Sequence, residues 1–207
     1  MRLLFVCFSM LISLDIFSQV LNYGLSNNCQ KNTECYPEYC DEIRSVVLIG
    51  YLRNDTIVPG CTGVLLNNEK LDGKPYLFTE NHCIYSESFS YTINENIIED
   101  IVILFNYEAD ECFPNTPVTA PSNVNLINGA KIVSNFDDGL TDFALLELIE
   151  DIPQSFYPFF SGWTNSENTP DPKQGFVIHH PRGDIKNFQI IMILIENIVV
   201  TIIDTGM

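Results

Sequence analysis

The chain has 207 residues, and 46% of them are apolar, which is enough for a sizeable core and too many for an intrinsically disordered chain. Its 10 lysines and arginines against 27 aspartates and glutamates give a formal net charge of -17. Nucleic acids and anionic membrane surfaces attract proteins of the opposite charge, so we expect neither kind of partner. The part beyond residue 18 has no uninterrupted apolar run of about 18 residues, so we expect no membrane-spanning segment.

Residues 1–18 have the composition of a secretory signal peptide. Arg2 is a short basic region, Leu3–Leu14 form an apolar stretch, and Ser18 is a small residue at which cleavage would leave Gln19 as the new N-terminus. The alternative is a buried N-terminal strand. We expect a secreted protein, extracellular or periplasmic.

The cysteines favour disulfides. Cys7 would leave with the signal, and an even number of cysteines in an exported chain is typical of disulfides rather than of metal ligands. A zinc site is disfavoured because the sequence has no Cys-x-x-Cys pair. Sequence alone leaves the pairing open among the six remaining cysteines, which are Cys29, Cys35, Cys40, Cys61, Cys83 and Cys112.

The polar, cysteine-bearing residues 19–41 are expected to form an N-terminal arm. From residue 44 onward, short runs with β propensity alternate with turn signals at a spacing of about ten residues, and no 3.6-residue period is sustained, so the pattern predicts an all-β sandwich or barrel. The predicted strands are 45–51, 60–66, 76–79, 101–107, 131–134 and 143–148. Acidic clusters such as 108–111 and 137–138 lack EF-hand spacing and indicate solvated loops rather than calcium sites.

Two residues are candidates for chemistry. His82 lies beside Cys83, and a disulfide between Cys61 and Cys83 would fix its backbone, as a catalytic imidazole requires. Asp142 precedes the predicted strand 143–148, and a carboxylate at the mouth of a buried strand can orient an imidazole through its Nδ1 proton. The alternative makes His82 a hydrogen-bonded core histidine and Asp142 a turn residue.

Several segments resemble the chymotrypsin-like serine endopeptidases, most closely the bacterial lysyl endopeptidase group. The resemblance covers about residues 29–188 and rests on CTGVLLNN at 61–68, KPYLFTENHC at 74–83, TDFALLEL at 141–148, SGW at 161–163 and IHHPRGDIK at 178–186. It implies that His82 is the general base, that Asp142 orients it, and that protein or peptide is the substrate. Glu80 departs from the pattern, since the group has a small alanine there.

The resemblance also implies the disulfides Cys61–Cys83 and Cys35–Cys112, and it leaves Cys29 without its usual partner, so that a Cys29–Cys40 bridge is possible. It makes His179-His180 a strand-to-loop element rather than a metal site, and Trp163 is expected to pack rather than to bind substrate. No cofactor is implied, no metal is expected, and the oligomeric state stays undetermined.

The nucleophile of this class is absent from the sequence. It belongs to a Gly-x-Ser-Gly loop after the aspartate, but the last serine is Ser166. Residues 189–207 contain seven isoleucines and no Lys, Arg, Ser or Pro. One hypothesis is a truncated or frameshifted gene, and the alternative is one natural β-strand.

We therefore expect an all-β, chymotrypsin-like double β-barrel with an incomplete second barrel. Its parts are a signal peptide at 1–18, the arm at 19–41, a first barrel at 42–155 and a partial second barrel at 156–207. The expected function is that of a secreted trypsin-like serine endopeptidase that is inactive as given. The alternatives are a secreted pseudoprotease that binds peptides or proteins, and a structural disulfide-rich surface domain.

Overall fold

The computed structural model describes residues 26–27, 30–54, 56–85, 91, 93–112, 124–163 and 174–192. The expected signal segment, Cys29 and residues 193–207 lie outside these residues. The elements in chain order are β1 Lys31–Asn32, η2 Thr33–Cys35, η3 Pro37–Tyr39, α1 Cys40–Ser45, β2 Val46–Arg53, β3 Thr56–Leu66, β4 Tyr76–Thr79, η4 Asn81–Cys83, β5 Ile93–Asn94, β6 Ile97–Phe105, β7 Asn125–Asp137, β8 Asp142–Leu148, η5 Gln154–Phe156, β9 Gln174–His179, η6 Pro181–Gly183 and β10 Asn187–Met192.

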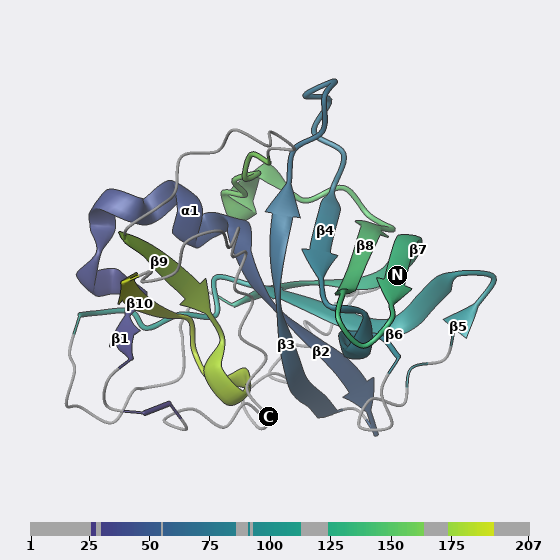
Figure 1. Ribbon diagram of the computed structural model, residues 1–207, viewed down its shortest axis with the longest axis horizontal. Coiled ribbons are helices and arrows are strands. Elements are labelled where there is room, and N and C mark those ends of the chain that lie inside the picture. Colours follow the sequence, from purple (N-terminus) through teal and green to yellow (C-terminus); the bar gives the residue numbers. More distant parts are fainter. Residues whose placement is uncertain are drawn as a thin grey trace, which may run out of the picture.

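Six strands close into a barrel. The larger sheet has the order β2-β3-β4-β8-β7-β6-β5, and an additional antiparallel pairing of β2 with β6 joins the two sides. Because β2 and β6 pair, the six longer strands have no open edge between them, and β5 extends the sheet as a short hairpin with β6. Figure 1 shows β4 and β8 following β3 in this order. The expected all-β barrel is confirmed.

Alternating side chains fill the barrel. In β8 the residues Ala144, Leu146 and Leu148 are buried, whereas the residues between them are partly exposed. The same alternation in β4 buries Leu77 and Thr79. This period of two is what a strand with one buried face requires, and it is why both strands are visible in the sequence.

Strand β2 is buried on both faces, from Val46 to Tyr51. Val47 and Ile49 belong to the barrel core, whereas Leu48 belongs to a second cluster that also contains Leu104 and Ile185. The outer face of β2 and β6 is therefore covered by the chain that leads into β10. This packing brings the C-terminal segment of the described chain against the barrel.

A three-stranded antiparallel sheet, in the order β1-β10-β9, lies beside the barrel (Figure 1). The arm supplies β1 and stacks the ring of Tyr36 on that of Phe188, with 4.0 Å between the ring centroids. A disulfide between Cys35 and Cys112 ties the arm to the chain that follows β6. In the described part of the chain, no helix has the length and apolar character needed to cross a membrane.

Candidate active site

Strand pairing explains why His82 and Asp142 meet. Thr79, at the end of β4, pairs with Ala144 of the antiparallel strand β8. His82 follows Thr79 by three positions and Asp142 precedes Ala144 by two, so both lie at the same end of this strand pair. The structure thus brings together the two residues that the sequence analysis selected as base and orienting carboxylate.

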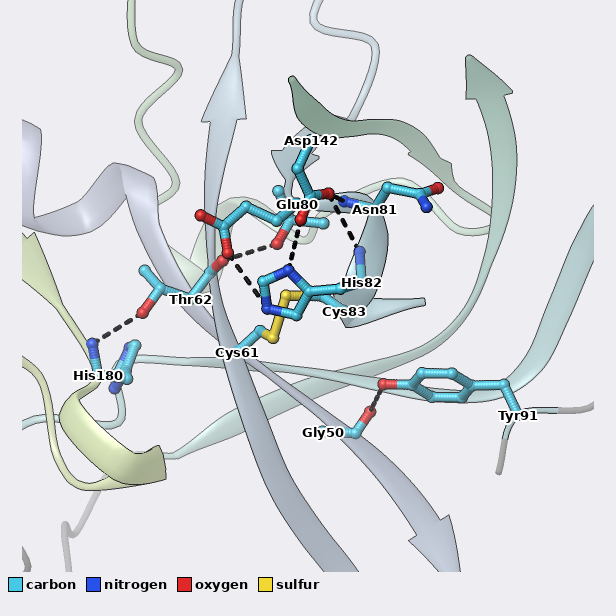
Figure 2. The surroundings of a disulfide bond; sticks show 11 residues. Gly50, Cys61, Thr62, Glu80, Asn81, His82, Cys83, Tyr91, Asp142 and His180 are labelled. Atoms are coloured by element: carbon cyan, nitrogen blue, oxygen red, sulfur yellow. Dashed lines mark hydrogen bonds and ion pairs between the residues drawn. A yellow bond between two sulfur atoms is a disulfide. The ribbon is translucent and has the colours of Figure 1, made fainter. Parts of the chain in front are cut away.

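The disulfide between Cys61 and Cys83 anchors the short helix η4 that carries His82. Cys61 belongs to β3 and Cys83 is fully buried, so the bridge fixes the backbone beside the imidazole to the barrel wall. Figure 2 shows the histidine ring standing directly over this bridge. The two sulfur atoms and a His82 nitrogen lie within 4.8 Å of one another, but because the sulfurs are bonded to each other they are not available as metal ligands.

A tight turn immediately precedes Asp142 and fixes its position. Gly139 has a φ of 81°, in the left-handed region that glycine adopts without strain. The carboxylate of Asp138 accepts hydrogen bonds from the backbone N–H groups of Leu140 and Thr141, at 3.0 and 2.7 Å. The Asp137-Asp138-Gly139 turn signal of the sequence therefore forms the β7–β8 hairpin, and β8 begins at Asp142.

The Asp142 carboxylate binds both the ring and the backbone of the helix. Its Oδ2 lies 2.6 Å from Nδ1 of His82, and its Oδ1 accepts hydrogen bonds from the backbone N–H groups of Asn81 and His82 (Figure 2). Asn135 of β7 in turn donates its side-chain N–H to the Asn81 side-chain oxygen at 2.7 Å. Asn81 and Asn135 were not predicted as site residues, because no local sequence pattern marks a residue that supports another one.

These contacts keep Asp142 ionised. Partial burial alone would raise the pKa of its carboxyl, but the hydrogen bonds from the His82 ring, the His82 N–H and the Asn81 N–H outweigh burial and hold the pKa below its ordinary value. An ionised acceptor at Nδ1 places the imidazole proton on that nitrogen. The other nitrogen, Nε2, is then the proton acceptor of the ring.

The Nε2 side of the ring faces a second carboxylate. Oε2 of Glu80 lies 3.4 Å from Nε2, and the side chains are 38% exposed for His82 and 23% exposed for Glu80, although this Oε2 atom is itself buried. Within the described residues, no serine hydroxyl contacts Nε2. The described Ser161, for example, donates its hydroxyl to the side chain of Ser45 and pairs through its backbone with Leu65.

The histidines of the IHHPRGDIK segment are buried and structural. The backbone N–H of His180 donates a hydrogen bond to the Thr62 hydroxyl oxygen, and the ring donates from Nδ1 to the Asp184 carbonyl at 2.9 Å. Burial, and then the nearby Lys186, hold its pKa well below the ordinary value, so the ring is neutral. Trp163 donates its indole N–H to the Asn67 carbonyl at 3.0 Å and remains half-exposed.

Lys186 is a buried cation that the sequence analysis did not identify. Its Nζ donates to the carbonyl of Ile43 at 2.9 Å and to the carboxylate of Glu108 at 3.0 Å, and its side chain is 1% exposed. Burial lowers the pKa of this amine, and Glu108 opposes the shift. The hydrogen bond to Ile43 and the ion pair with Glu108 join helix α1, the segment after β6 and the segment before β10. Cys40, by contrast, has a free and exposed thiol, so no bridge joins it to Cys29.

The closed barrel, with a histidine and an aspartate joined at one end of it, is consistent with the all-β chymotrypsin-like fold. A family model described as "Lysyl endopeptidase, C-terminal domain" matches residues 23–195. The chain therefore belongs to the lysyl endopeptidase family, as the sequence motifs indicated.

A curated relative is the lysyl endopeptidase of Pseudomonas aeruginosa. It is 25% identical to this chain over 174 residues, which cover 80% of the chain and 34% of the relative. The chain thus spans about a third of the length of the relative that it matches.

Proposed function

We propose that His82 and Asp142 are the general base and its orienting carboxylate in a serine endopeptidase site that acts on peptide bonds. The observation that supports this proposal best is the 2.6 Å contact between Nδ1 of His82 and Asp142, made at one end of a closed barrel. Protein or peptide is the substrate class, because that is what an endopeptidase family acts on. No cofactor is needed for this chemistry.

In the proposed reaction, Nε2 of His82 accepts the hydroxyl proton of a serine as the serine oxygen forms a bond to the substrate carbonyl carbon. The proton then passes from Nε2 to the leaving amine as the peptide C–N bond breaks, which leaves an acyl-enzyme for water to hydrolyse. Asp142 stays ionised and stabilises the imidazolium that forms between these steps. The disulfide beneath the ring holds the imidazole in one position throughout.

We propose further that the 207-residue chain does not turn over peptides by itself. Its last serine is Ser166, and the neighbour of Nε2 in the described part of the site is the Glu80 carboxylate, which does not replace the serine hydroxyl as the nucleophile. The second candidate function, a pseudoprotease that binds peptides without cleaving them, is favoured by the same carboxylate, because it lies on the side of the ring from which a nucleophile would be activated.

A fluorophosphonate probe, used with a mixed peptide substrate library, tests these proposals. We expect the purified chain neither to be labelled nor to cleave peptides, while immobilised chain retains some of the library. Labelling or turnover that disappears in His82→Ala would establish an active nucleophile and overturn the inactivity of the chain. Absence of peptide retention together with absence of labelling would remove the pseudoprotease function and leave a structural module.

We also propose that the protein is exported, from the signal-like composition of residues 1–18. N-terminal mass spectrometry of the protein recovered from its natural source should find Gln19 as the first residue. An intact Met1 or Arg2 on the accumulated protein would contradict cleavage and export by this route.

A further inference from the structure

The pair formed by Glu80 and His82 has the spacing of two ligands of one metal ion. Oε2 of Glu80 and Nε2 of His82 are 3.4 Å apart. A charge-assisted hydrogen bond between an imidazolium and a carboxylate would be shorter, at about 2.7–2.9 Å. Two ligands of a tetrahedral zinc ion, each about 2.1 Å from the metal, are about 3.4 Å from one another.

The other side of the ring matches the environment of a metal-binding histidine. Such a histidine donates its second ring N–H to a carboxylate, which fixes the tautomer and raises the basicity of the ligating nitrogen. Asp142 accepts from Nδ1 at 2.6 Å and is itself held by two backbone N–H groups (Figure 2). Nε2 is thus left as an oriented lone pair, with the Glu80 carboxylate beside it.

Access and rigidity also fit a metal ion. The His82 and Glu80 side chains are 38% and 23% exposed, whereas the Oε2 atom of Glu80 is buried beside the ring, so an ion would have to reach the pair from the His82 side. The backbone of both residues is held on the barrel, since Glu80 follows β4 directly and Cys83 is bonded to Cys61 of β3. A ligand pair fixed in this way loses little freedom when it binds.

We propose that Glu80 and His82 form a binding site for a borderline-soft divalent ion such as Zn²⁺, with Asp142 as the positioning residue of the histidine. An imidazole nitrogen favours zinc over the hard ions Mg²⁺ and Ca²⁺, which select oxygen ligands. Zinc on Nε2 would occupy the lone pair that a general base needs. The site therefore makes the chain sensitive to zinc through the residue proposed as its base, and Glu80 supplies the second ligand.

Calorimetric titration of the full 207-residue chain with Zn²⁺, at near-neutral pH and with the disulfides intact, tests this site. We expect Glu80→Gln and His82→Ala each to lower the association constant of one zinc ion about 100-fold or more, and Asp142→Asn to lower it about 10- to 100-fold. Glu69→Gln makes the same charge change at an exposed residue elsewhere, and should leave this binding unchanged.

Three results would overturn the proposal: no zinc binding by the parent chain, binding that is insensitive to Glu80→Gln, or binding of Ca²⁺ with the same strength and the same sensitivity. Circular dichroism of each variant separates loss of the site from loss of the fold. The inference shares His82 with the proposed function but does not depend on it, since zinc binding is measured without any peptide. A chain that binds zinc and retains no peptide would uphold this inference and reject the pseudoprotease function, and the reverse result would do the opposite.

Discussion

Nδ1 of His82 lies 2.6 Å from Oδ2 of Asp142, although 60 positions separate the two residues in the chain. The contact exists because β4 and β8 pair antiparallel and end together, and because a disulfide on one side and a glycine turn on the other fix where each residue emerges. The geometry of the site is therefore a property of the barrel, and changes to the barrel should alter it in predictable ways.

The first prediction concerns pH and stability. Because the folded pKa of Asp142 lies below its ordinary value of 3.8, its contribution to folding is complete above that value and is lost as the pH falls through the lower folded pKa. Asp142→Asn should reduce the free energy of unfolding by about 1.5 kcal/mol near neutral pH. This value is at the lower end of the range for hydrogen bonds to charged groups, because Asp142 is partly exposed. In urea unfolding measured at a series of pH values, the gap between the two proteins should close below about pH 4. A gap that stays constant into strong acid would contradict this account of Asp142.

The second prediction compares the two disulfides. Cys61 and Cys83 are 22 positions apart, and Cys35 and Cys112 are 77 apart. Replacing the first pair by alanines should cost roughly 3 kcal/mol, and replacing the second pair about 4 kcal/mol, because the longer loop gains more freedom in the unfolded chain. Denaturant unfolding of the two double variants measures both costs. Equal and small effects, below about 1 kcal/mol, would show that neither bridge constrains the unfolded chain in this way.

The third prediction tests the buried ion pair. Lys186→Met should cost about 3 kcal/mol, since it leaves the Glu108 carboxylate and the Ile43 carbonyl without their buried donor. Adding Glu108→Gln should restore part of that loss, because the unpaired charge is then removed. Thermal or urea unfolding of the two single variants and the double variant gives the coupling energy. Strict additivity of the two costs would mean that the pair does not interact.

The fourth prediction concerns the turn that precedes Asp142. A Cβ added at Gly139 would have no atom within 4 Å, so Gly139→Ala introduces no clash, and its cost comes from the left-handed backbone alone. We expect a loss of about 1 kcal/mol in the free energy of unfolding. Gly162 is equally open but has no left-handed φ, so Gly162→Ala is the matched control and should change stability by less than about 0.5 kcal/mol. Equal effects at the two positions would exclude a conformational origin.

The sequence predicts those parts of the fold that have a local pattern. Strand β4 coincides with the predicted strand 76–79, because its residues alternate between a buried and a partly exposed face. Strand β7 is much longer than the predicted strand 131–134, because its second half is exposed and a register shift between Ile132 and Ser134 breaks the alternation. Strand β9 and helix α1 were not predicted. Helix α1 is only six residues long, too short to show a helical period, and β9 pairs with β10 in a part of the sequence that has no alternating pattern.

The same distinction holds for the site. His82 and Asp142 were selected through motifs that surround them, whereas the supporting contact of Asn135 with Asn81 depends on tertiary structure alone. Lys186 shows the limit most clearly, because a lysine in a polar segment predicts a solvated side chain. Only the partners that folding brings to it, Glu108 and the Ile43 carbonyl, account for its burial.

Proton and nitrogen NMR of the His82 ring tests the central geometry most directly. The chain has three histidines, and His82→Ala assigns the signals of this one. We predict a strongly deshielded proton on Nδ1 near neutral pH, and we expect this signal to be absent in Asp142→Asn. Nε2 should give the nitrogen signal of an unprotonated ring nitrogen in the absence of zinc, and that of a metal-bound nitrogen once zinc is added. A ring that has its proton on Nε2 instead, or an Nδ1 proton that Asp142→Asn leaves unchanged, would contradict the proposed pairing of base and carboxylate.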